Sequence, residues 1–381
     1  MPETLTVKQF DSLAGLEPAA WNALTDCGNP FVSHEYLFGL ERHDCLADHG
    51  WLPSHLCAFG DGGLIGAMPM YARTNSYGEF VFDWAWADAY EQAGGSYYPK
   101  LVSAIPFAPV IGPRLLTGDH PGAGAIRAAL LARALEMVEA SAMSSFHCLF
   151  TGAADHPAFA QKHLLERLTC QYHWFNRGYR DFQDFLDSLS SKRRKQIRRE
   201  RRQVAEAGIE VEVLRGHEIR PEQWKVFHEF YCSTFYRRWG NPRLTLEFFR
   251  SLSETLPDRT LLILARRAGD YIAGAFSMLG SDTVFGRHWG CSEHLPFLHF
   301  ELCYYQTIEF CIRHGLRSVD AGVQGEHKLS RGFEPVMARS FHWIRHPGFR
   351  KAVAEYLDRE TREMNWYLEE LSNHLPYKSA D

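Results

Sequence analysis

The sequence predicts an α/β protein of two domains. At 381 residues, the chain is long enough for two domains of ordinary size, each with its own core. A hydrophobic content of 45% and an aromatic content of 14% exclude a disordered or fibrous class. Both halves follow the same order of helix, antiparallel strands, helix and strand, which indicates a structural duplication. In each half, a parallel strand pair joined by a crossover helix predicts a mixed sheet.

In the first half, apolar periodicity and turn residues set the expected elements. Ser33 fits an N-cap, so a helix should follow it. The Tyr- and Pro-rich passage 97–113 is expected to be an ordered loop. The other expected elements are strands 5–10, 54–59, 64–72, 80–86, 146–151 and 170–175, and helices 18–24 and 125–140.

The second half is expected to follow a basic helix at 190–208. Its expected strands are 209–214, 261–266, 271–279, 283–290, 318–320 and 338–344, and its expected helices are 221–238, 246–256, 296–315 and 351–371. We therefore expect an N-terminal domain of residues 1–180, a basic helix or linker of residues 181–208, and a C-terminal domain of residues 209–381.

Residues 296–344 combine the features of a functional site. Apolar residues on most sides of the helix 296–315 predict that it is buried, and Gly315 suits its end. The next strand should end at Asp320, and a loop crowded with Glu, His, Lys and Arg follows it. A strand that opens into a polar loop is a frequent way to build a site on an α/β scaffold.

Charge and cysteine usage narrow the class of protein. The net charge is −5, yet residues 192–202 carry eight basic side chains and one acidic one. Nine cysteines without a C-x-x-C pair suggest reduced thiols and a cytoplasmic protein. The sequence shows no secretory signal and no apolar run of membrane-spanning length.

Several motifs resemble the predicted N-acyltransferases described as peptidoglycan biosynthesis/recognition, FemAB-like. They are Asn29-Pro-Phe-Val-Ser33-His34, Gly78-Glu79-Phe-Val-Phe-Asp83-Trp84, Tyr97-Tyr98-Pro99-Lys100, Ser191-Lys192-Arg193-Arg194-Lys195, His299-Phe-Glu301-Leu-Cys-Tyr-Tyr-Gln306 and Gln324-Gly-Glu326-His327-Lys328-Leu-Ser-Arg331-Gly332-Phe333. The repeated element order is also similar to two tandem GNAT-type domains. The resemblance covers nearly the whole chain. It implies two tandem GNAT-like acyltransferase domains, each a mixed, mostly antiparallel sheet flanked by helices.

The resemblance also implies an activity. The expected enzyme is an N-acyltransferase that moves an aminoacyl or acyl group directly to an amine, without a covalent enzyme intermediate. FemAB-like enzymes generally take aminoacyl groups from tRNA, so the expected donor is aminoacyl-tRNA or acyl-CoA, and no tightly bound cofactor is expected. The expected acceptor is an amine-bearing small molecule or cell-wall precursor.

Transfer to an amine needs a group that removes its proton. Glu326, His327 and His299 are the catalytic candidates, because histidine titrates near neutrality and burial raises the pKa of a glutamate toward it. A solvated loop at Glu326 and His327, and a satisfied polar pair of His299 with Glu301, are the alternatives.

Further residues are expected to bind substrate or phosphate. The substrate set is Arg287, His288, Trp289, Glu301, Tyr305, Asp320, Lys328 and Arg331. The phosphate set, for a tRNA or a phosphorylated carrier, is Lys192, Arg193, Arg194, Lys195, Arg198 and Arg201. The alternatives are a helix-stabilising role for Glu301, a turn cap at Asp320 and a solvated linker for the basic helix.

Two other functions stay open. One is an acyl-CoA-dependent GNAT N-acetyltransferase, although residues 291–299 contain no glycine and so depart from the usual pyrophosphate-binding pattern. The other is a non-catalytic protein that recognises a cell-wall precursor or RNA. No metal site is expected, because His228 and Cys232 lack an evident third ligand.

Overall fold

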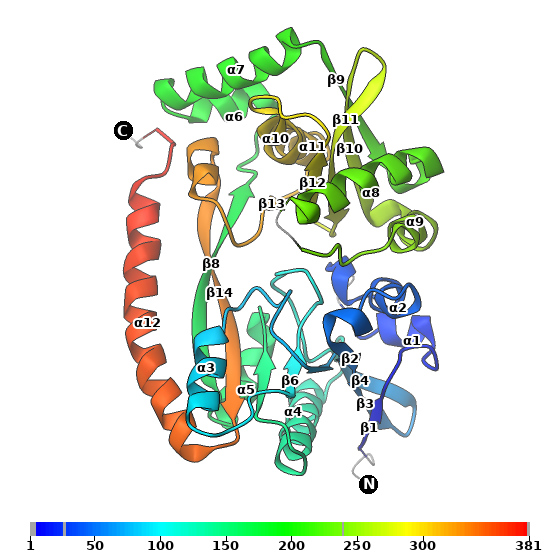
Figure 1. Ribbon diagram of the computed structural model, residues 1–381, viewed down its shortest axis with the longest axis vertical. Coiled ribbons are helices and arrows are strands. Elements are labelled where there is room, and N and C mark those ends of the chain that lie inside the picture. The colour runs from blue at the N-terminus through cyan, green and yellow to red at the C-terminus, as the bar shows by residue number, and fades with distance from the viewer. Residues whose placement is uncertain (1–4, 26–27, 238–239, 379–381) are drawn as a thin grey trace. The chain divides into compact units, whose positions relative to one another are not determined.

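The computed structural model describes residues 5–25, 28–237 and 240–378 (Figure 1). The chain divides into two compact units. Unit 1 comprises Met1–Thr169 and Met337–Trp366, and unit 2 comprises Cys170–Val336 and Tyr367–Asp381.

Unit 1 contains two groups of strands. One is the antiparallel sheet β1-β3-β4, and the other has the order β2-β5-β6-β7-β14, in which only β6 and β7 are paired in parallel. The strands are β1 (Thr6–Phe10), β2 (Trp51–Pro53), β3 (His55–Gly60), β4 (Gly63–Met68), β5 (Tyr71–Arg73), β6 (Lys100–Ser103) and β7 (Ser145–Cys148). The helices are α1 (Pro18–Asn22), α2 (His34–Arg42), α3 (Trp84–Gln92), α4 (Ala123–Glu139) and α5 (His156–Gln161).

Unit 2 has the strand order β8-β13-β12-β11-β10-β9, in which only β12 and β13 are paired in parallel. The strands are β9 (Ile209–Arg215), β10 (Thr260–Arg267), β11 (Asp270–Leu279), β12 (Thr283–Cys291) and β13 (Ser318–Asp320). The helices are α6 (Phe182–Ser188), α7 (Ser191–Glu206), α8 (Pro221–Tyr236), α9 (Leu246–Thr255), α10 (Leu298–Phe300) and α11 (Gln306–Arg313).

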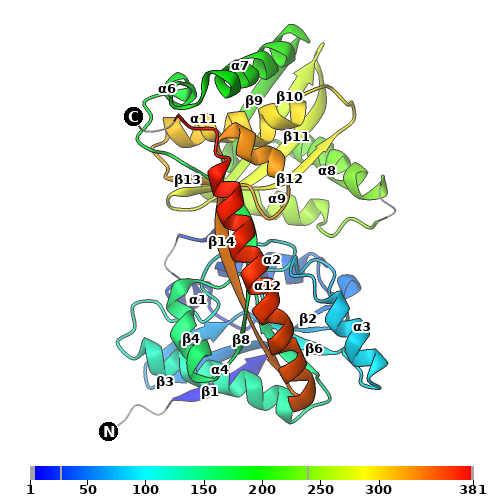
Figure 2. The ribbon, with the colours of Figure 1, turned by 90° about the vertical axis from the view of Figure 1, so that its left-hand side faces the viewer.

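Three elements contain residues of both units. They are β8 (Leu165–Phe175), β14 (Glu334–Ile344) and α12 (Pro347–Asn373), and Figure 2 shows α12 as one unbroken helix. Strands β8 and β14 are neighbours in the hydrogen-bonded order of 11 strands. The division therefore differs from the expected boundaries at 180 and 208, because β14 returns to pair with β7 and brings residues 337–366 into unit 1.

Most expected elements are present, but the strand expected at 80–86 is wrong. Helix α3 begins at Trp84, and residues 80–83 are irregular. Phe80 has φ 60°, which a strand does not allow, and Asp83 turns inward to accept a hydrogen bond from Lys100 Nζ at 2.6 Å. The expected last residue of the helix 221–238 lies outside the described residues.

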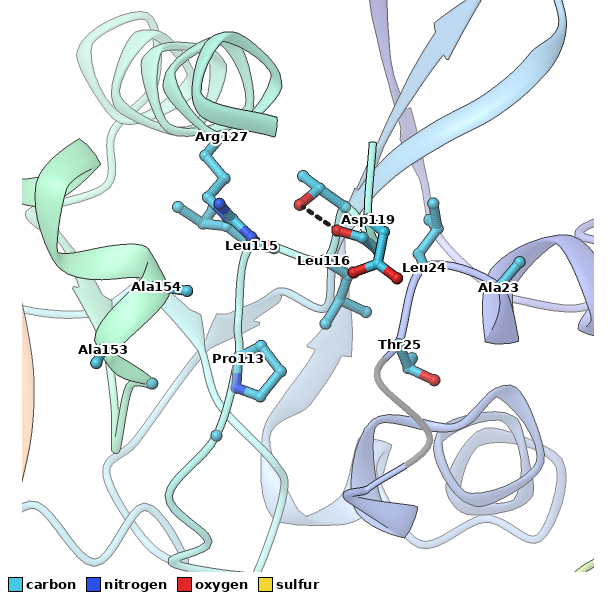
Figure 3. Close-up of a pocket in the computed structure, with 14 residues that line it drawn as sticks. Ala23, Leu24, Thr25, Pro113, Leu115, Leu116, Asp119, Arg127, Ala153 and Ala154 are labelled. Carbon is cyan, nitrogen blue, oxygen red and sulfur yellow. Dashed lines mark hydrogen bonds between the residues drawn. The ribbon is translucent and has the colours of Figure 1, made fainter. Parts of the chain in front are cut away.

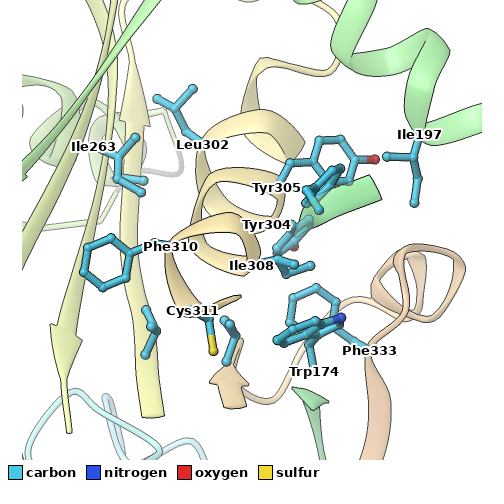
Figure 4. Close-up of a cluster of buried hydrophobic side chains, with 14 of the residues drawn as sticks. Trp174, Ile197, Ile263, Leu302, Tyr304, Tyr305, Ile308, Phe310, Cys311 and Phe333 are labelled. Carbon is cyan, nitrogen blue, oxygen red and sulfur yellow. The ribbon is translucent and has the colours of Figure 1, made fainter. Parts of the chain in front are cut away.

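The expected helix 296–315 is interrupted by a π-helical turn. Residues Glu301–Tyr305 are π-helical between α10 and α11. The helix lies in the main core of unit 2, where Leu302, Ile308 and Cys311 are fully buried (Figure 4). π-Helical turns are rare overall, but those that occur are often found at functional sites. The extra residue in such a turn changes the directions in which the neighbouring side chains point.

Candidate functional site

A cavity lies where the two parallel strands of unit 2 separate. Strands β12 and β13 pair only over residues 283–285 and 318–320, and β12 then continues to Cys291. A cavity of about 480 Å³ follows this divergence and is lined by β11, β12, the 298–305 helix and the loop after β13. Open α/β sheets bind ligands at the carboxyl ends of parallel strands. We therefore take this cavity as the candidate site.

Six of the predicted residues line this one cavity. They are Arg287, His288, Trp289, His299, His327 and Lys328. Ring contacts place two of them on opposite faces of β12, since His288 packs on Tyr231 of α8 and Trp289 packs on His299. The sequence thus brings together residues from three separate elements.

A β-bulge sets the position of Arg287. Phe276 pairs with His288 and Ser277 pairs with Gly286, so Arg287 is the extra residue on β12. Its Nη2 donates to Asp320 Oδ2 at 2.7 Å. Burial raises the pKa of Asp320, but Arg287, His173 and the Gly322 amide together outweigh burial, and the pKa lies below its usual value. Asp320 therefore anchors Arg287 and does not itself line the cavity.

The loop after β13 brings His327 to the cavity. Its Nε2 lies 2.9 Å from the Tyr304 hydroxyl, and the two are hydrogen bonded. Gly325 has φ 104°, and a Cβ there would lie 2.5 Å from Cε1 of His327, so only glycine allows this ring position. Burial lowers the pKa of His327, and the nearby Arg331 and Lys328 lower it further. His327 therefore favours the neutral imidazole more than an ordinary histidine does.

His299 is a second neutral imidazole in the lining. Its ring packs edge-on against Trp289 and Tyr304, with centroids 5.2 and 5.3 Å away. Burial lowers its pKa to about 4, with His327 and Lys328 contributing. Protonating His299 would cost more free energy than protonating an ordinary histidine.

Lys328 is a buried cation in the cavity wall. Its side chain donates to the Ala321 carbonyl, and the residue is 5% exposed. Among the described residues, no carboxylate forms an ion pair with it, and the cavity lining contains neither Asp nor Glu. Burial lowers its pKa to about 8, although Asp320 opposes this shift. The Lys328 ammonium would therefore stabilise a negative charge in the cavity, whether on a bound ligand or developing during a reaction.

Glu326 lies outside the cavity lining. Both Glu326 and His327 are exposed, but Oε1 of Glu326 accepts a hydrogen bond from the Tyr367 hydroxyl at 2.8 Å, and only His327 lines the cavity. The structure therefore separates the two loop residues that the sequence treats as equal candidates.

Three predicted substrate residues instead form ion pairs and hydrogen bonds in the interior. Arg331 Nη2 lies 2.9 and 3.0 Å from the two carboxylate oxygens of Glu200, and the Tyr305 hydroxyl donates to the same carboxylate. Glu301 accepts from Arg201 Nη2 at 3.0 Å. None of these side chains lines the cavity. They join α7 to the π-helical turn and to the loop after β13.

The six predicted phosphate-binding residues of α7 are likewise divided. Arg194 bonds to Asp187 at 2.8 Å, Arg201 is paired with Glu301, and Arg193 donates to Gln196. Lys192, Lys195 and Arg198 are exposed, as are Arg199 and Arg202. The helix thus has an inner face that holds the fold and an outer basic face.

The cavity also includes four polar residues that sequence reasoning did not select. They are Ser277, Cys303, Tyr304 and Gln324. Ser277 lies in a strand, and Cys303 and Tyr304 lie in a helix, that are apolar on nearly all sides, so periodicity does not single them out. The π-helical turn, which local periodicity does not reveal, places Cys303 and Tyr304 here.

Unit 1 has a cavity of its own. It has a volume of about 570 Å³, and Figure 3 shows Arg127 and Asp119 among its lining residues. No predicted site residue lines it. Within the described part of the chain, no cluster of three or more His, Cys, Asp or Glu side chains is arranged to hold a metal. Among the same residues, no helix has both the length and the apolar character needed to span a bilayer.

Solved structures share this fold at low sequence identity. FemX is 11% identical, with 91% of this chain and 100% of that chain covered and a TM-score of 0.55. The C-terminal domain of a protein from Agrobacterium fabrum, named as a lysylphosphatidylglycerol synthetase, is 8% identical, with 88% and 95% covered and a TM-score of 0.53. A conserved protein of unknown function from Bacteroides thetaiotaomicron is 12% identical, with 88% and 99% covered and a TM-score of 0.51.

At these identities, the similarity shows the fold alone. With the mixed sheets described above, it confirms the predicted class of two tandem GNAT-like domains flanked by helices. No curated protein matches the chain. The family model described as peptidoglycan biosynthesis/recognition matches residues 12–379, and the chain therefore belongs to the FemAB-like family.

Proposed function

We propose that this chain is an N-acyltransferase that joins an aminoacyl or acyl group to an amine inside the unit 2 cavity. The observation that carries the proposal is the cavity lining, which combines the neutral base His327 with the buried cation Lys328 and contains no carboxylate. The family match and the fold shared with FemX support the reaction class.

The proposed chemistry uses the two residues in the same step. The acceptor nitrogen forms a bond to the acyl carbon and loses a proton to His327, while Lys328 stabilises the negative charge on the carbonyl oxygen. The bond between the acyl carbon and the donor then breaks, and the proton passes to the leaving oxygen or sulfur. Tyr304 keeps the His327 ring in position through their 2.9 Å hydrogen bond.

Direct transfer is favoured over a covalent enzyme intermediate. Cys303 is the thiol in the cavity lining, and burial raises its pKa well above the ordinary value. The thiol therefore stays protonated at neutral pH and is a weak nucleophile.

The donor and the compartment are further parts of the proposal. The outer basic face of α7 supports aminoacyl-tRNA, whose phosphates such a face attracts. Acyl-CoA is the second candidate, supported by the divergence of β12 and β13, where GNAT-like donors lie. The acceptor is an amine-bearing small molecule or cell-wall precursor, in line with the family description. The eight described cysteines are free thiols, which supports the cytoplasm.

The test is a transfer assay with labelled donors. Purified protein is incubated with charged tRNA or acetyl-CoA and an amine-bearing cell-wall-precursor fraction, and acylated products are identified by mass spectrometry. We expect His327→Gln to lower product formation about a hundredfold, the scale of a lost general base. His314→Gln, an exposed histidine outside the cavity, is the matched control and should keep full activity.

Glu326→Gln decides between the two loop candidates. Retained activity in this variant assigns proton removal to His327, and a comparable loss returns the assignment to Glu326. Absence of product from folded wild-type protein with every donor would contradict the proposed reaction.

A further inference from the structure

Three large aromatic side chains form an exposed cluster on unit 1. Tyr77 is 64% exposed, Phe82 is 49% exposed and Trp84 is 45% exposed. The ring centroid of Trp84 lies 5.1 Å from that of Phe82 and 6.0 Å from that of Tyr77. Single exposed apolar residues are normal, but contiguous exposed rings mark interaction sites. We call these three residues the aromatic platform.

The platform stands on a buried network of charged side chains. Arg73 Nη2 donates to the Tyr77 carbonyl at 2.8 Å, and its Nε donates to Glu79 at 3.1 Å. Lys100 Nζ donates to Glu79 at 2.7 Å and to Asp83 at 2.6 Å. All four charged side chains are buried. The backbone that carries the platform is therefore fixed at both ends of its loop.

A second buried guanidinium supports the middle of the loop. Arg167 Nη1 donates to the Phe82 carbonyl at 3.0 Å, and the same guanidinium is paired with Glu360 at 2.7 Å. A preorganised surface loses little conformational entropy when a ligand binds. The buried charged side chains thus fix the exposed rings in one arrangement, although burying charge costs free energy.

The charges around the platform select the class of ligand. Residues 74–96 contain no Lys, Arg or His. Asp88 and Glu91 follow Trp84 by four and seven positions on α3, so they lie on the same helix face, and both are exposed. An anionic membrane or a nucleic acid would meet two exposed carboxylates and no cation from residues 74–96. A neutral ligand with apolar faces and many hydroxyl donors fits instead.

We propose that the aromatic platform binds a glycan, with pyranose C–H faces against the rings of Tyr77, Phe82 and Trp84 and sugar hydroxyls donating to Asp88. Pyranose rings present flat C–H faces that pack on aromatic rings, and their hydroxyl groups hydrogen bond to carboxylates. The binding site belongs to unit 1 and does not depend on the reaction proposed for unit 2.

The experiment measures binding of chitotetraose by calorimetry and retention on purified insoluble peptidoglycan. We expect wild-type protein to bind both, Trp84→Ala to lose at least tenfold in affinity, and Asp88→Asn to lose several-fold. The matched control is Trp366→Ala, which removes a 66% exposed tryptophan of unit 1 outside the platform and should bind as wild type. If Trp84→Ala does not fold, Tyr77→Ala takes its place.

Three results would overturn the proposal. The first is no binding of either glycan probe by wild-type protein, and the second is equal binding by the platform variants. The third is a different occupant of the platform. Wild-type protein would then bind vesicles of neutral and anionic lipid, or associate with itself, and would not bind glycans. Trp84→Ala would lose that binding. Because activity is not the readout, failure here leaves the transfer reaction untouched, and the reverse also holds.

Discussion

Arg331 and Glu200 form a two-pronged ion pair in the interior of unit 2, with Nη2 at 2.9 and 3.0 Å from the carboxylate oxygens. Arg331 Nε donates to the hydroxyl of Tyr305 in the π-helical segment at 3.1 Å, and its Nη1 donates to the His327 carbonyl at 2.8 Å. One side chain therefore fixes the basic helix, the π-helical segment and the loop that carries the proposed base. It acts on His327 in two ways, by holding its backbone carbonyl and by lowering the pKa of its imidazole.

Removing Arg331 should destabilise the protein. Arg331→Ala leaves the Glu200 carboxylate buried without its partner, which typically costs about 3–5 kcal/mol of unfolding free energy. Urea denaturation should show this loss. The control is Arg202→Ala, which removes an exposed arginine of α7, the helix that carries Glu200. Its unfolding free energy should change little. The double variant Glu200→Gln/Arg331→Met should recover much of the loss, and equal stability of Arg331→Ala and wild type would refute a structural role.

Gly325 should be needed for activity through the position of His327. Gly325→Ala places a Cβ 2.5 Å from the imidazole, so the ring must leave its place beside Tyr304. The control is Gly269→Ala, which has a similar φ of 94° but no atom within 4 Å of the added Cβ. Both variants carry backbone strain of about 1–3 kcal/mol. Only Gly325→Ala should lose activity in the transfer assay, and equal rates in the two folded variants would contradict this reading.

The pH dependence should show two limbs. His327 must be neutral, and its pKa is lowered by burial, so the rate should fall only as pH drops below the usual histidine range near 6.5. Lys328 must be charged, and its pKa is about 8, so the rate should also fall above about pH 8. The assay should use an acceptor whose amine is unprotonated over the whole pH range, so that only His327 and Lys328 change charge. Lys328→Met should lower the plateau and remove the alkaline limb; an unchanged alkaline limb would exclude Lys328 as its origin.

Local patterns predict local structure well in this chain. Strand 318–320 is predicted at its observed residues, and the expected helix 190–208 appears as α7, Ser191–Glu206. Periodicity and terminal residues specify such elements without help from distant parts of the chain. The strand expected at 80–86 fails because Lys100, far along the sequence, holds Asp83 inward.

The roles of charged residues depend on partners that the sequence does not show. Glu301 and Arg201 are paired across 100 positions, so neither could be assigned to an ion pair from its neighbours. One signal was present: Ile197, Glu200 and Val204 share the buried stripe of α7, which marks Glu200 as an inward acid in a basic run. The cavity residues His299 and His327 were predictable because histidine titrates near neutrality, which makes it a candidate base wherever it lies near a polar loop.

The outer basic face of α7 should bind tRNA without contributing to stability. Lys195, Arg198 and Arg199 are exposed, so Lys195→Glu/Arg198→Glu/Arg199→Glu should abolish retention of tRNA on a filter while the melting temperature stays nearly constant. Retention by wild type should fall steeply with salt, because phosphate contacts release counterions. Arg201→Glu gives the opposite pattern: it places a carboxylate beside Glu301 and Glu309, so the melting temperature should fall. Retention that ignores both the triple reversal and added salt would make α7 a solvated helix and acyl-CoA the favoured donor.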